Sequence, residues 1–121
     1  MTRQQTVERL RLWAQRAQHE SVEADTWQNA QHWQGQAQVL AAVANFVAGQ
    51  APEVSDKQVW RRVVADRQRT VAEWFTRQGP EESDTGSAPF YAGRVAGYDV
   101  ALTALKDMAG RVWPRFEEHI G

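Results

Sequence analysis

Residues 26–52 contain no Asp, Glu, Lys or Arg, although charged residues make up 24% of the chain. Apolar residues recur here at helical spacing, and the polar side chains form only a narrow line along one side: Gln31, Gln34, Gln38 and Asn45. A helix that is apolar over most of its circumference is normally buried on more than one side. The helix predicted at 25–48, with Gly49 as its stop, therefore needs packing partners on at least two sides.

The rest of the chain also has the apolar periodicity of helices, and no stretch alternates with period two for long. Thr2 with Gln5, and Ser55 with Gln58, have the spacing of capping boxes, which satisfy free N–H groups at a helix start. Short connections between helices favour an all-α fold, an antiparallel up-down four-helix bundle. The predicted helices cover residues 2–19, 25–48, 55–78 and 87–109, with a short C-terminal helix at about 114–119.

The charge pattern of the first half of the chain recurs in the second half. Residues 1–19 carry four Arg and one Glu, and residues 61–78 carry five Arg, one Asp and one Glu; an acidic segment follows each. A shift of 58 residues also aligns His32-Trp33-Gln34-Gly35-Gln36 with Phe90-Tyr91-Ala92-Gly93-Arg94. One interpretation is a single domain, residues 1–121, built from two duplicated hairpins at about 2–50 and 54–112. The other is that any two amphipathic hairpins share such a pattern.

Small residues form one face of the helix predicted at 87–109. Gly costs about 1 kcal/mol relative to Ala inside a helix, so Gly93 and Gly97, four residues apart, indicate a close approach of another backbone. Together with the uncharged helix, this face gives more apolar surface than one small bundle buries. We therefore expect a homodimer, with an interface formed by Val39, Val43, Phe46, Gly93, Gly97 and Ala101.

Two arginines lie within otherwise apolar stripes. Arg67 falls among Trp60, Val63 and Trp74, and Arg94 falls between two tyrosines. A buried guanidinium needs a carboxylate or several carbonyl partners. Each arginine is therefore either a structural ion pair or snorkelling side chain, or the anchor for an anionic ligand in an aromatic pocket.

The six Trp residues divide into two groups. Trp27 lies on the polar line of its helix and Trp113 precedes a proline, so these two are candidates for a partner interface. The others lie on apolar faces and are expected in the core: Trp13, Trp33, Trp60 and Trp74.

Nucleic-acid binding is an alternative function. Arginines seven residues apart on outward helix faces can follow a phosphate backbone. The net charge of −1 argues against this function, and so does the diagonal placement of the first and third helices in an up-down bundle. The arginines concerned are Arg9 and Arg16 on the first helix, and Arg62 and Arg69 on the third.

No catalytic or metal-binding motif is present in the sequence. There is no cysteine, and His19, His32 and His119 lack the Glu-x-x-His spacing of bundle metal sites. The pair Glu20 and Glu23 falls in a predicted turn. We expect no cofactor and no metal, and we favour a protein that is not an enzyme. The longest apolar run, about ten residues, is too short for a membrane span, and no secretory signal is evident, so we expect a cytoplasmic protein.

The sequence thus favours a small helical interaction or accessory protein that works as a homo-oligomer, with itself or another protein as partner. A nucleic-acid-associated protein is the first alternative. An anion or small-molecule binder that uses Arg67 and Arg94 is the second.

Overall fold

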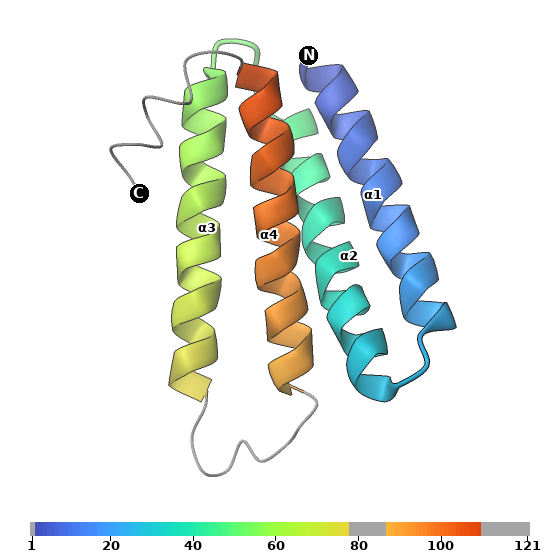
Figure 1. Cartoon of the computed structure of the whole chain (residues 1–121). Helices are drawn as coiled ribbons and strands as arrows, with labels where there is room; N and C mark the ends of the chain where they lie inside the picture. The colour runs from blue at the N-terminus through green and yellow to red at the C-terminus, as the bar shows by residue number, and fades with distance from the viewer. Residues whose placement is uncertain (1, 78–86, 110–121) are drawn as a thin grey trace.

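The computed structural model describes residues 2–77 and 87–109 (Figure 1). These residues form four helices and, within the described ranges, no strand, so the predicted all-α four-helix bundle is confirmed. The predicted helix at 114–119, and with it Trp113 and His119, lies outside the described residues. The helices are α1 (Arg3–Glu23), α2 (Trp27–Ala48), α3 (Asp56–Arg77) and α4 (Ser87–Ala109).

Local capping decides where the helices begin. The Thr2 hydroxyl accepts a hydrogen bond from the Gln5 backbone N–H at 3.1 Å, and the Gln5 side chain accepts one from the Thr2 N–H at 3.0 Å. Ser55 and Gln58 form the same reciprocal pair, at 3.1 and 2.9 Å. Both predicted capping boxes are therefore present at the starts of α1 and α3.

The turn between α1 and α2 is shorter than predicted. α1 continues to Glu23, so Glu20 and Glu23 lie on the helix and not in a turn. α2 is capped by Thr26, whose hydroxyl accepts from the Asn29 N–H at 3.1 Å, instead of beginning at Asp25. The hydroxyl of Thr26 therefore caps α2, one residue after the predicted start at residue 25.

α2 and α4 form the centre of the molecule. α1 packs mainly on α2, and α3 packs on α4, so α1 and α3 lie on opposite sides of the central pair (Figure 1). Ion pairs join the start of α1 to the start of α3 and to the end of α4, and successive helices run in opposite directions. α2 is therefore covered by α1 on one side and by α4 on another, which explains why it carries no charge.

The α2–α4 contact is made through glycines in a reciprocal arrangement. A Cβ at Gly93 would overlap the backbone of His32, and a Cβ at Gly35 would overlap the backbone of Phe90. The 58-residue shift places His32 on Phe90 and Gly35 on Gly93, so the two contacts are one contact with the helices exchanged. Such exchange is the property of an isologous, two-fold contact. The crossing therefore supports the interpretation of two related hairpins.

This crossing also changes the assignment of the expected oligomer interface. The sequence predicted a homodimer interface of six residues. Five of them are buried within the single chain: Val39, Val43, Gly93, Gly97 and Ala101. Phe46 is partly buried against the core, with the Arg62 guanidinium 5.6 Å from its ring centre. Five of the six are thus covered by this chain and are not available to a second copy. A homodimer remains a prediction, and it needs a different surface.

Candidate functional site

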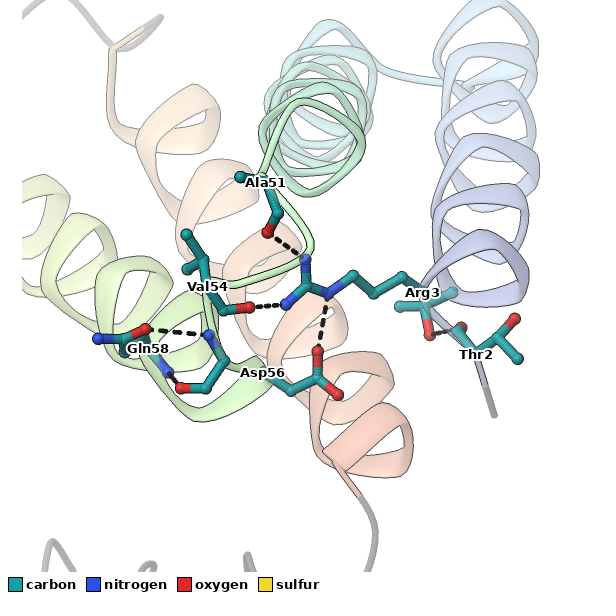
Figure 2. A network of polar contacts seen from close by, with 8 residues as sticks. Thr2, Arg3, Ala51, Val54, Asp56 and Gln58 are labelled. Carbon is teal, nitrogen blue, oxygen red and sulfur yellow. Dashed lines mark hydrogen bonds and ion pairs between the residues drawn. The ribbon is translucent and has the colours of Figure 1, made fainter.

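Arg3 connects three elements at one end of the bundle (Figure 2). Its Nε donates to Asp56 Oδ1 at 2.8 Å, and its terminal nitrogens donate to the backbone carbonyls of Ala51, at 3.0 Å, and of Val54. The guanidinium therefore holds the start of α1 against the loop that leads into α3. Sequence reasoning missed this residue because its partners lie about fifty positions away. The one local signal is a cation in the first turn of a helix, where the helix dipole is unfavourable to it.

Arg67 is engaged in an ion pair between α3 and α4. Its Nε lies 2.7 Å from Asp99 Oδ1, and the two side chains are 35% and 57% exposed. Of the two alternatives for Arg67, the structural ion pair is therefore the one observed. The partner was not foreseen because helical periodicity gives the face of Arg67 but not the residue opposite it.

Arg94 differs from Arg67 because its Nε is buried and has no hydrogen-bond partner among the described residues. Its guanidinium lies 5.6 Å from the ring centre of Tyr91. The indole Nε1 of Trp74 is also buried, with no hydrogen-bond partner in the part of the chain that the structure describes. Anion binding at Arg94 therefore stays a prediction.

The arginines predicted to follow nucleic acid are mostly paired within the chain. Arg9 forms an ion pair with Asp107 at 3.3 Å, and Arg62 and Arg69 both contact Asp66, at 3.4 and 3.0 Å. Of the four, Arg16 alone has no hydrogen bond or ion pair with another described residue. The two arginine faces also lie on helices at opposite sides of the bundle (Figure 1). These positions do not form one phosphate-binding stripe.

A cleft of about 340 Å³ is formed by α1, α2 and α4. Trp13 and Trp33 are half-buried and line it, whereas Trp60, at 5% exposure, is a fully buried core residue. The expectation that Trp13 and Trp33 belong simply to the core is therefore incomplete, because each also contributes to an open surface. The residues around the cleft are Trp13, Arg16, Ala17, Glu20, Trp33, Gln36 and Val100.

Large exposed apolar side chains gather at one end of the bundle, which we call the turn end. It is formed by the C-terminal ends of α1 and α3 and the N-terminal ends of α2 and α4 (Figure 1). Val22 is 74% exposed, Trp27 is 50% exposed and Phe75 is 70% exposed. Leu12, 54% exposed, lies instead near the middle of α1. Trp27 is thus open to a partner, as its place on the polar line predicted.

No group of three His, Asp or Glu side chains in the described ranges could hold a metal ion. His32 instead lies edge-on to Trp33, with ring centres 6.1 Å apart. None of the described helices is long and apolar enough to cross a membrane. No protein-family model matches the chain, and neither does any curated protein or solved structure.

Proposed function

We propose that this chain is a small non-enzymatic helical interaction protein whose partner at the turn end is a second copy of itself. The observation that carries this proposal is the exposure of Val22 near the end of α1 and of Trp27 at the start of α2, on the two sides of the α1–α2 turn. Trp is the residue most enriched among the side chains that dominate protein interfaces. Burying the exposed half of its indole contributes about 2 kcal/mol at 25 cal/mol per Å².

The same end of the bundle carries a further exposed apolar side chain. Phe75 is exposed near the end of α3. This end of α3 lies on the opposite side of the bundle from the α1–α2 turn (Figure 1). A two-fold axis through this end places the Trp27-bearing turn of one copy on the Phe75-bearing end of α3 of the other. The contact then forms twice, which closes the dimer.

The alternative of nucleic-acid binding has less support. The outward arginines Arg9, Arg62 and Arg69 already have carboxylate partners in the chain, so phosphate contacts would have to replace those pairs. Phosphate contacts also release counterions, so strongly salt-dependent retention on DNA or RNA would favour that alternative instead.

Sedimentation equilibrium over a wide range of protein concentrations tests the proposal. Wild type should dimerise, and Trp27→Ala should weaken the dimer by about a thousandfold, because a contact worth about 2 kcal/mol is lost twice in a two-fold dimer. Leu12→Gln is the matched control, because Leu12 is similarly exposed but lies away from the turn end. It should leave the dissociation constant unchanged.

A wild-type chain that stays monomeric at every concentration would contradict the proposal. Equal weakening by Leu12→Gln and Trp27→Ala would also contradict it, because that result places the contact elsewhere or makes it nonspecific.

A further inference from the structure

The cleft between α1, α2 and α4 combines two aromatic walls with two opposite charges. Trp13 from α1 and Trp33 from α2 are both half-buried, and Val100 from α4 adds an aliphatic surface. Flat apolar walls of this kind favour a planar, apolar ligand body. The volume of about 340 Å³ lies at the lower end of the range for small-molecule sites, so the ligand is small.

The charges of the cleft come from Arg16 and Glu20, one helical turn apart on α1. Side chains at this spacing are neighbours on a helix surface, and an Arg with a Glu there readily forms an ion pair. In this structure the two side chains line the same cleft, yet neither has an ion-pair or hydrogen-bond partner among the described residues. A guanidinium and a carboxylate about one turn apart therefore remain available, together with the Gln36 amide.

Arg9, seven residues before Arg16 on the same helix, is held by other residues of the chain. Arg9 is held by Asp107 at 3.3 Å, and its guanidinium lies 5.6 Å from the ring centre of Trp13. Arg9 therefore lies over the Trp13 ring, while Arg16 has no hydrogen-bond or ion-pair partner among the described residues. Arg16 is therefore available to a ligand anion, whereas Arg9 holds the Trp13 ring that lines the cleft.

We propose that this cleft binds a small zwitterion with a planar apolar side chain, of which a free aromatic amino acid is the simplest example. The ligand carboxylate accepts hydrogen bonds from Arg16, since a guanidinium matches a carboxylate in geometry. The ligand ammonium group donates to Glu20 and Gln36. The aromatic ring lies between Trp13 and Trp33. The cleft shares no residue with the proposed dimer contact of Val22, Trp27 and Phe75, so its test and the dimer test fail independently.

Three probes that share one ring separate the parts of this proposal. L-phenylalanine carries both charges, hydrocinnamate lacks the ammonium group and phenethylamine lacks the carboxylate. Titrations are followed by the indole N–H resonances in ¹⁵N NMR, assigned with Trp13→Phe and Trp33→Phe variants. L-phenylalanine should shift the Trp13 and Trp33 resonances saturably. It should bind about tenfold more tightly than either single-charge probe, as expected for one charge-assisted hydrogen-bonded contact.

Charge-removing variants assign the two contacts. Arg16→Gln should remove the advantage of L-phenylalanine over phenethylamine, and Glu20→Gln should remove its advantage over hydrocinnamate. Arg11→Gln is the matched control, because Arg11 is an exposed arginine of the same helix that lines a different cavity. It should change nothing. Circular dichroism melting checks that each variant is folded.

The proposal is overturned if L-phenylalanine gives no saturable shift up to its solubility limit. It is overturned equally if the three probes bind alike, or if Arg11→Gln weakens binding as much as Arg16→Gln does.

Discussion

Substituting Gly93 by Ala tests the central helix contact, because helix propensity and packing predict opposite signs. An exposed helical Gly→Ala change stabilises a protein by about 1 kcal/mol. At Gly93 the new Cβ would overlap the carbonyl oxygen of His32, and would lie 2.7 Å from its carbonyl carbon and 2.9 Å from its Cα. All three are backbone atoms, which cannot rotate away. We therefore expect the closer packing to make Gly93→Ala less stable than wild type.

The magnitude follows from those distances. Ordinary van der Waals contact begins at 3.4 Å, so α2 and α4 must separate by roughly 0.7 Å or more at their closest point. Forcing one extra carbon into a close-packed core costs about 1–3 kcal/mol. The loss comes at the upper end of this range because backbone must move on both helices. After the propensity gain, we expect a net destabilisation of about 2 kcal/mol, or a melting temperature lower by about 8 °C.

Urea unfolding followed by circular dichroism measures this change. Gly35→Ala should behave like Gly93→Ala, because Gly35 meets the backbone of Phe90 and Arg94 in the exchanged contact. Gly49→Ala is the control, since the nearest atom to its new Cβ is the Asn45 carbonyl oxygen at 3.4 Å. Its stability should stay within about 0.5 kcal/mol of wild type. A Gly93→Ala variant as stable as wild type, or more stable, would refute the reasoning.

Two arginine substitutions should show that Arg3, which makes three contacts, contributes more to stability than Arg67, which forms one surface ion pair. Arg3→Met removes one carboxylate and two carbonyl contacts at once, so the free energy of unfolding should fall by about 1–2 kcal/mol in urea titrations. A change below about 0.5 kcal/mol would show that the three Arg3 contacts contribute little to the free energy of unfolding. Arg67→Met breaks a half-exposed pair and should cost less than about 1 kcal/mol by the same measurement, despite its 2.7 Å distance. A loss larger than that of Arg3→Met would reverse this ranking.

The helices could be predicted from the sequence because their signals are local. Both capping boxes join residues three positions apart, and the stop at Gly49 follows directly on the apolar run. The boundary between α1 and α2 was less clear, since Asp25 and Thr26 are both good caps and only the backbone conformation chooses between them.

The residues that pack against each predicted helix face could not be predicted from local sequence signals. Gly93 and Gly97 correctly indicated a close backbone, but periodicity does not say which backbone, and the answer is α2 of the same chain. Arg67 was predicted to lie on a buried apolar stripe, whereas its side chain is 35% exposed and its partner, Asp99, lies 32 residues away. Trp13 and Trp33 were assigned to apolar faces, but an apolar face does not reveal whether the packing closes over it.

The most direct test of the proposed assembly is to mix two weakened variants, Trp27→Ala and Phe75→Gln. Each contact of the proposed dimer pairs Trp27 of one copy with Phe75 of the other. In a homodimer of either variant, one member of each pair is changed, so both contacts are weakened. The mixed dimer puts both changes into one contact and leaves the other contact intact, with Trp27 of one copy on Phe75 of its partner. Sedimentation equilibrium should therefore show a mixed dimer that is tighter than either homodimer. A mixture no tighter than the separate variants would contradict the account.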